Sequence, residues 1–234
     1  MPKVIITAGG TIEKIDAARS ITNNSTGHLA LEIAKALTTR HPAPQSCHCV
    51  PKCCHCGLDP QSHPFDIIYI KGKTDQTPNF CEVVEIESAK DLDAAITKIC
   101  TTQKIHAIIH AMAVSDYRVK NADFSAKISS DADELTLTLE KIPKTIANLR
   151  KLAPNALIIG FKLTSNLTKE QTLDKAHALL QKNHCNFVLA NDTSNLTKEG
   201  HVGYLVDTNK NFTTHIGKAN IAHAISQEVK KCLT

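Results

Sequence analysis

Three polar loops of this sequence carry residue types that can bind a small anionic molecule. The first places the pair Gly9-Gly10 and Thr11 ahead of the segment Ser20–His28, whose sequence is SITNNSTGH. Glycine lets backbone N–H groups approach a phosphate, and a helix that follows adds the positive end of its dipole. The glycines match neither G-x-G-x-x-G nor a Walker A sequence, so a tight turn without a ligand is an equally good interpretation of them.

The polar residues Asn23–Thr26 stand directly before a helix that we predict to begin near Gly27. All four are of types that are common at helix N-caps, and such a cap is therefore expected among them. One cap uses one such residue, and Arg19 lies just upstream. The surplus of donors and acceptors indicates a site for an anion or a carboxylate.

The second loop, Ala111–Tyr117, ends a buried strand in small residues and then presents Asp116. Backbone groups there can face a ligand while the carboxylate binds a hydroxyl or an amide, although a turn aspartate is the simpler alternative. Lys127 and Lys182 can each neutralise a phosphate, but most lysines are merely solvated. The third polar loop is Ala190–Lys198, which also follows a buried strand.

Strands that alternate with helices are expected to position these loops. Strands are predicted over residues 4–6, 66–70, 82–86, 105–113, 134–140, 156–163, 186–190, 201–206 and 211–215, and helices from near 27 and over 90–101, 169–183 and 218–232. This alternation predicts an α/β fold with a doubly wound, mostly parallel sheet in one domain, 1–234, and ligands at the carboxyl ends of the strands. Residues 134–140 differ, because polar and apolar residues alternate there as in a half-exposed strand.

The composition argues against a nucleic-acid-binding or membrane protein. The chain has 234 residues, is 42% hydrophobic and carries a net charge of +4 that is spread along its length. Nucleic-acid binding typically needs a basic cluster. No apolar run reaches the roughly 20 residues of a transmembrane helix, and no secretion signal precedes the first strand. We therefore expect a soluble, cytoplasmic protein.

Five of the nine cysteines lie in one histidine-rich segment, residues 41–64. Its composition suits zinc, but its spacing matches no common zinc finger. His-Pro stands at both ends of the segment, as expected for an in-frame insertion that duplicated its target. We expect a disordered surface insertion, which costs little stability, and keep a zinc site as the alternative.

Seven segments in order resemble the phosphopantothenoylcysteine synthetase family, in particular its stand-alone bacterial form. They are ITAGGT (6–11), RSITNNSTGH (19–28), HAMAVSDY (110–117), AKISS (126–130), KIPKTI (141–146), IGFKL (159–163) and KNHCNFVLAND (182–192). The resemblance implies a Rossmann-like ligase that joins 4'-phosphopantothenate to cysteine in coenzyme A synthesis. It implies an acyl-nucleotidyl intermediate made from CTP, with ATP as the alternative, and Mg²⁺ held through the triphosphate rather than by an assigned protein site.

The resemblance also implies roles for residues at matching positions. Asn23 and Lys127 correspond to catalytic residues, the first by hydrogen bonding to the acyl group and the second in making the anhydride. Substrate contacts correspond to Arg19, Asn23, Ala113 and Asp116. Nucleotide contacts correspond to Gly9, Gly10, Thr11, Ser25, Ala111, Met112, Asp116, Lys127, Pro143, Lys144, Thr145, Ile146, Phe161 and Lys182.

Residues 118–141 correspond to a projecting dimerisation arm, so we expect a homodimer in which Arg19 reaches across the interface. Two departures from the family pattern matter. Ala178 stands where many members have a second lysine, and the segment KISS leaves Lys127 without neighbouring lysines.

Two other classes of function are kept open. TAGGTI resembles the TGGTI element of asparaginase-like amidohydrolases, whose first threonine is a nucleophile, but we find no second threonine-aspartate-lysine element. A nucleotide-sensing Rossmann module without catalysis is the alternative from the binding class; it would bind the nucleotide without releasing pyrophosphate.

Overall fold

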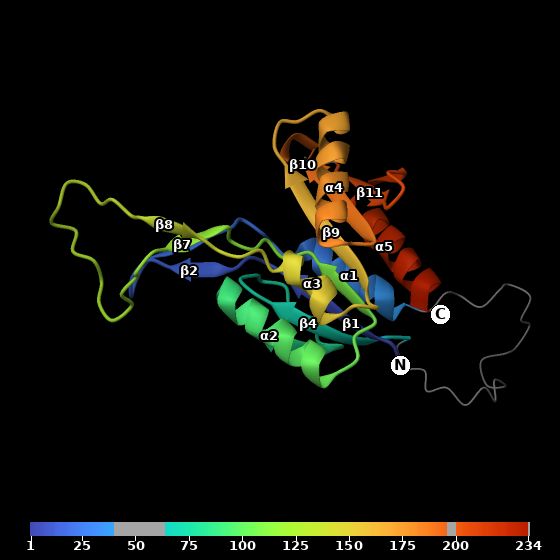
Figure 1. The fold of residues 1–234 in the computed structure, drawn as a ribbon, viewed down its shortest axis with the longest axis horizontal. Helices are drawn as coiled ribbons and strands as arrows, with labels where there is room; N and C mark the ends of the chain where they lie inside the picture. Colours follow the sequence, from blue (N-terminus) through green and yellow to red (C-terminus); the bar gives the residue numbers. More distant parts are fainter. Residues whose placement is uncertain (40–63, 196–199, 234) are drawn as a thin grey trace, which may run out of the picture.

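An eight-stranded sheet forms the centre of the molecule (Figure 1). The computed structural model describes residues 1–39, 64–195 and 200–233. The strand order is β12-β11-β10-β9-β6-β1-β4-β5. The strands are β1 (Lys3–Ala8), β4 (Asp66–Lys71), β5 (Glu82–Glu85), β6 (Ala107–His110), β9 (Leu157–Thr164), β10 (Phe187–Asp192), β11 (Val202–Asp207) and β12 (Phe212–Ile216). All pairs from β5 to β10 are parallel, while β11 and β12 form an antiparallel hairpin. The predicted fold class is confirmed.

The described residues form five α-helices that cover both faces of this sheet. They are α1 (His28–Thr38) and α5 (Lys218–Leu233) on one face, and α2 (Ala89–Thr102), α3 (Ile146–Leu152) and α4 (Lys169–Asn183) on the other. Alternate residues of β1 point to opposite faces of the sheet. Ile5 lies in the cluster with α2, α3 and α4, whereas Val4 and Ile6 lie in the cluster with α1 and α5. Strands buried on both faces are apolar throughout, which explains the continuous β-branched runs.

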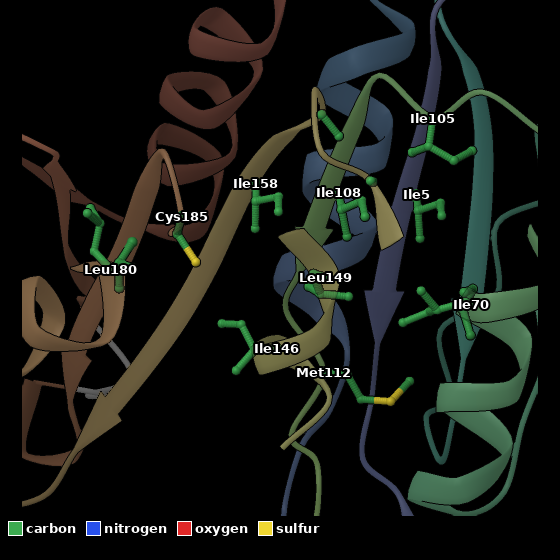
Figure 2. Packing of buried hydrophobic residues seen from close by; sticks show 14 of the residues in the cluster. Ile5, Ile70, Ile105, Ile108, Met112, Ile146, Leu149, Ile158, Leu180 and Cys185 are labelled. Atoms are coloured by element: carbon green, nitrogen blue, oxygen red, sulfur yellow. The ribbon is translucent and has the colours of Figure 1, made fainter. Parts of the chain in front are cut away.

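The middle of the sheet is held by isoleucines in register. Ile5 pairs with Ile108, which pairs in turn with Ile158 on the next strand. Figure 2 shows the three side by side, with Leu149 and Ile146 of α3 below them in the view. The chain passes from β1 to β4 in one direction and later returns to β6 on the other side, so strand order reverses at β1 and β6. Sheets of this kind bind ligands beside such a reversal.

The start of α1 differs from the prediction. The N-cap is Gly27, at φ 70°, and no side chain caps the helix. The expected cap among Asn23–Thr26 is therefore wrong, because those residues belong to the loop that crosses in front of the helix. Several short elements escaped prediction: the hairpin of β2 (Ile12–Lys14) and β3 (Ser20–Thr22), the strand Tyr117–Val119, helix α3 and the 3-10 helix Thr193–Asn195.

A long arm projects from the sheet (Figure 1). At its base β7 (Tyr117–Val119) pairs with β8 (Leu139–Lys141), and Lys120 N donates one further bond to Thr138 O. The strand predicted over 134–140 is thus wrong for residues 134–138, which lie beyond the paired base. Alternation gives an exposed strand only where another strand supplies hydrogen bonds. The arm carries the exposed apolar side chains of Phe124 and Leu135.

Nearly all of the predicted Cys/His-rich insertion, residues 41–63, lies outside the described residues, so the insertion and zinc hypotheses stay predictions. Among the helices of the described residues, none has the length and apolar character needed to span a membrane.

Candidate functional site at the carboxyl edge of the sheet

Two adjoining hollows lie where the central parallel strands end. The first, of about 480 Å³, is lined by the start of α1 and by the segment after β6. Its remaining lining residues are Phe161 and Leu163 of β9, Asn191 of β10, His201 just before β11, and Lys218 at the start of α5. The second, of about 160 Å³, lies between the ends of β6 and β9 and the start of α3. Met112, Phe161 and Leu163 line both. One elongated ligand can therefore occupy the two hollows together.

The first hollow contains one lysine and no carboxylate. Lys218 lines it together with the imidazole of His201, and no aspartate or glutamate is among its lining residues. Asn191 Nδ2 lies 3.1 Å from His201 Nε2 and fixes the imidazole ring. Burial lowers the pKa of His201, and the charge of Lys218 lowers it further. The uncapped start of α1 adds the positive end of a helix, so this hollow suits an anion.

The second hollow offers mixed polar groups. Lys144 Nζ lies 3.3 Å from Asp116 Oδ1 at its edge. The Thr145 side chain is buried and its Oγ1 has no hydrogen-bond partner, so it can serve a ligand in the hollow. Burial lowers the pKa of His110 to about 4, which keeps the ring neutral near pH 7. A carboxylate, a hydroxyl and the aromatic ring of Phe161 together suit a ribose and a base.

The glycine loop supports the site from behind. Gly10 N donates to Lys73 O, and Thr11 N donates to Ala113 O. A Cβ atom on Gly9, which has φ +80°, would lie 2.6 Å from Lys73 O. The N–H groups of Gly10 and Thr11 are therefore engaged within the chain, and the nucleotide contact expected of Gly9, Gly10 and Thr11 stays a prediction. The glycines are needed for close backbone approach.

Asn23 is not among the residues that line the first hollow, but its side chain is bonded to one of them. Its Nδ2 donates to Ala113 O at 3.2 Å, and Ser25 N donates to Asn23 O at 3.0 Å. The side chain is exposed, so the amide is held in place but open to a ligand. Ser25, Ala111 and Ala113, which the sequence predicted as contacts, line the same hollow.

Arg19 and Lys127 lie apart from both hollows, where the turn between β2 and β3 meets residues 126–128 of the arm. Arg19 Nη1 pairs with Asp16 Oδ2 at 3.2 Å, and Arg19 Nη2 donates to Ile128 O at 3.3 Å. Ile128 N donates to Asp16 Oδ2, which places the exposed Lys127 beside the same loop. Burial alone would raise the pKa of Asp16, but backbone N–H donors and the Arg19 charge hold it below its ordinary value. One buried carboxylate thus ties the two predicted cations together.

Lys182, which was predicted to contact nucleotide, does not line either hollow. It is exposed in the last turn of α4, which leads to the start of β10 at the amino edge of the sheet. Leu179, one turn earlier, lines the second hollow instead. Pro143 is exposed beside that hollow, whereas its neighbours Lys144, Thr145 and Ile146 line it.

Sequence reasoning missed Asn191, His201 and Lys218 in the first hollow. Asn191 lies in the family-like segment 182–192 and directly follows the strand predicted over 186–190, which was a usable signal. His201 and Lys218 begin a strand and a helix that are distant in sequence, so no local pattern pointed to them. The buried Asp192 was missed too; it accepts bonds from Thr164, Asn166, Leu167 and Ser194 and ties the ends of β9 and β10 together.

The sequence matches the family described as DNA/pantothenate metabolism flavoprotein C-terminal domain, over residues 1–42 and 62–233. The match passes over residues 43–61, which lie inside the Cys/His-rich segment.

Curated relatives named coenzyme A biosynthesis bifunctional protein CoaBC are similar to this chain. That of Methanocaldococcus jannaschii is 33% identical over 82% of this chain and 41% of its own length. That of Thermococcus kodakarensis is 28% identical over 99% of this chain and 51% of its own length. The chain thus spans about half the length of the curated relatives that it matches.

Solved structures share the fold. The crystal structure of the DNA/pantothenate metabolism flavoprotein from Streptococcus pneumoniae has a TM-score of 0.80 and 27% identity, and the likeness covers 99% of both chains. A Cab2 mutant, H337A, in complex with phosphopantothenate-cysteine has a TM-score of 0.73 and 16% identity over 98% of this chain and 85% of its own. The second likeness is one of fold alone.

Proposed function

Because the chain belongs to the DNA/pantothenate metabolism flavoprotein C-terminal domain family, we propose that it is a ligase that joins 4'-phosphopantothenate to cysteine in coenzyme A biosynthesis. The name of its relatives, coenzyme A biosynthesis bifunctional protein, supports the pathway. In the proposed reaction a nucleoside triphosphate activates the carboxylate and the cysteine amine then displaces the nucleotide.

The observation that carries the proposal is the pairing of the two hollows around Phe161. A triphosphate fits the first hollow, whose lining is cationic and free of carboxylates. A nucleoside fits the second, which offers Asp116 for a ribose hydroxyl and Thr145 Oγ1 for the base. The α-phosphate would then lie where the hollows meet, near Ala113 and the amide of Asn23.

The first half-reaction forms the acyl-nucleotidyl anhydride. A carboxylate oxygen of 4'-phosphopantothenate bonds to the α-phosphorus, the bond to the β-phosphate bridge breaks, and pyrophosphate leaves with the electron pair. Like charges must approach one another in this step, so fixed cations lower its barrier. Lys127 and Mg²⁺ held by the triphosphate are the proposed charge partners.

The second half-reaction forms the amide. The cysteine amine attacks the acyl carbon, the nucleoside monophosphate leaves, and the amine loses a proton. Asn23 Nδ2 is the proposed donor to the acyl oxygen, because an uncharged amide binds that oxygen without exchanging a proton. Its placement against Ala113 O holds the side chain ready for this role.

We propose a homodimer in which the arm of one chain completes the site of the other. Arg19 and Lys127 lie at the contact between the β2–β3 turn and residues 126–128 of the arm rather than at the hollows of their own chain. Mixing two inactive variants, Arg19→Ala and Asn23→Asp, tests this arrangement. Half of randomly mixed dimers would hold one intact site, so activity should return to about a quarter of wild type. Mixtures that stay inactive would contradict the shared site.

CTP and Mg²⁺ are proposed co-substrate and cofactor. A hollow of about 160 Å³ suits a pyrimidine better than a purine, which favours CTP over ATP. The described residues hold no group of three or more His, Cys, Asp or Glu side chains able to bind a metal. Mg²⁺ would therefore be held chiefly by phosphate oxygens, which is its usual mode in nucleotide sites.

The amidohydrolase alternative has no support in the site. Thr7, the counterpart of the nucleophile, is fully buried in β1, and its hydroxyl is bonded to His110 Nδ1 and Met112 N. A hydroxyl engaged in this way has no access to a substrate.

One assay tests the proposal. The protein is incubated with 4'-phosphopantothenate, cysteine, Mg²⁺ and either CTP or ATP, and pyrophosphate and the amide product are measured together. We expect both with CTP and less of both with ATP. No amide with either nucleotide would overturn the ligase proposal, and nucleotide binding without pyrophosphate release would favour a sensing module.

A further inference from the structure

We infer that Lys218, with His201 positioned beside it, binds the β- and γ-phosphates that leave as pyrophosphate. The inference rests on the proposed function for the identity of the anion, and it concerns two residues that no family segment of the sequence includes. It deepens the proposal by naming where the leaving group is held.

The position of Lys218 carries the inference. It is half-buried, it lines the first hollow, and no carboxylate pairs with it among residues 1–39, 64–195 and 200–233. A half-buried ammonium that no protein carboxylate neutralises is available to an anionic ligand in the hollow. By contrast, Lys144 at the second hollow already faces Asp116.

His201 stands on the same wall and is held in one orientation. Asn191 Nδ2 contacts its Nε2 at 3.1 Å, and Gly217 N donates to His201 O at 2.9 Å. These contacts bind the start of β11 to the residue just before Lys218. A fixed ring costs little entropy when an anion arrives, so His201 acts as a positioning residue for the phosphate group.

The backbone adds to the field of these side chains. The first turns of α1 and α5 begin with Leu31 N donating to Gly27 O and Ile221 N donating to Gly217 O. Both glycines have positive φ, 70° and 88°, and glycine has no side chain to cap a helix. The two helices pack together, so their positive ends face the same region. These ends alone would make no site, but here they reinforce a lysine that lines a hollow.

The chemistry assigned to Lys218 is electrostatic. When the bond between the α-phosphorus and the bridging oxygen breaks, negative charge grows on the departing pyrophosphate. The ammonium group of Lys218 stabilises that charge electrostatically, and no proton transfer is required. The same contact should bind free pyrophosphate, the product of the first half-reaction.

The test is direct binding of pyrophosphate to the full-length protein, measured by titration calorimetry without other substrates. Lys218→Ala should weaken binding at least about tenfold, and Lys218→Arg should restore most of it. Lys231→Ala is the matched control, because it removes the same charge from the exposed far end of the same helix. His201→Gln should weaken binding less than Lys218→Ala, since Gln keeps a polar end near Asn191.

Each outcome decides the matter. Weakened binding in Lys218→Ala with unchanged binding in Lys231→Ala supports the inference. Equal binding by wild type and Lys218→Ala, or no pyrophosphate binding by wild type at millimolar concentration, overturns it. Ligase turnover is measured separately: wild-type protein that binds pyrophosphate through Lys218 but forms no amide would overturn the proposed function and leave this site standing.

Discussion

The two hollows differ from the contact between the β2–β3 turn and residues 126–128 of the arm in how far a single chain completes them. The hollows are built on the ends of β6, β9 and β10, and their walls already carry cationic, hydroxyl and aromatic groups. At the arm contact, the half-exposed Arg19 pairs with the buried carboxylate of Asp16, and the exposed Lys127 is next to Ile128, whose N–H donates to the same carboxylate. In the proposed reaction, nucleotide binding is assigned to the sheet of one chain, and acyl activation is assigned to the groups at the arm contact.

Replacing Lys127 should have the largest effect on this division. Lys127→Ala removes the proposed charge partner of the anhydride step, and the loss of one such group typically costs about 100- to 1,000-fold in rate. Pyrophosphate release should fall by this factor, while CTP binding measured by calorimetry changes little. Lys120→Ala, another exposed arm lysine, is the control and should stay near wild type. Equal losses in both variants would contradict the assigned role.

Phe161→Ala tests the other side of the comparison. Phe161 lines both hollows, and stacking of a base on an aromatic ring is worth about 1–3 kcal/mol. The KM for CTP should rise roughly 5- to 150-fold, with a smaller change in the KM for phosphopantothenate. Phe212→Ala, an exposed aromatic of β12, is the control. A Phe161→Ala variant that lost affinity only for phosphopantothenate would reverse the assignment of the two regions.

Asp16→Asn should weaken the contact between the β2–β3 turn and residues 126–128 of the arm and leave the two hollows unchanged. The variant loses the charge that faces Arg19, and a small misplacement of Arg19 and Lys127 should lower kcat/KM for phosphopantothenate by roughly tenfold. Asp123→Asn is the control, because Asp123 is exposed and its carboxylate accepts hydrogen bonds from Ser125 of the same arm. Unchanged kcat/KM in Asp16→Asn would show that the carboxylate does not position the cations.

The same carboxylate predicts a pH dependence of stability. Because the pKa of Asp16 is lowered in the folded protein, its ionised form stabilises the fold above the unfolded pKa of about 3.9, and this contribution is lost as pH falls. The difference in Tm between wild type and Asp16→Asn should therefore be full near pH 7 and shrink below about pH 4. A difference that grew on acidification would contradict the sign.

Lys182→Ala should have the smallest effect. Its charge is exposed at the far end of α4 and is screened by solvent, so the KM for CTP should rise no more than about threefold. A tenfold or greater rise would mean that the last turn of α4 reaches the nucleotide, and that the resemblance predicted this contact better than the arrangement of the hollows does.

The fold was predictable from sequence because buried strands and amphipathic helices leave strong periodic patterns. Helix α4 was predicted at the bounds that the structure has, and its capping box at Thr168 explains why its start is sharp. The β2–β3 hairpin and α3 were missed because they are short and owe their form to contacts with distant segments. The first part of the strand predicted at 134–140 is not paired in a sheet over residues 134–137, so the alternating pattern alone did not form it.

The site was predictable only in part. Ala111–Ala113, Asp116, Thr145 and Phe161 follow strand ends or lie near them, and the structure brings them together. The sequence did not reveal that the N–H groups of Gly10 and Thr11 donate to Lys73 O and Ala113 O within the chain. His201 and Lys218 stand at the starts of β11 and α5, which are far in sequence from the other residues of the first hollow. No local spacing in the sequence could place them there.

Asn23 stands at the boundary between the two regions, so one variant separates their roles most directly. Asn23→Asp is incubated with CTP, Mg²⁺, phosphopantothenate and cysteine, and pyrophosphate and amide are followed in a single turnover. The account predicts release of about one pyrophosphate per site with amide formation slowed at least about 100-fold, because the hollows still activate the acid while the acyl oxygen loses its donor. Amide formed at the wild-type rate, or loss of pyrophosphate release together with amide, would contradict it.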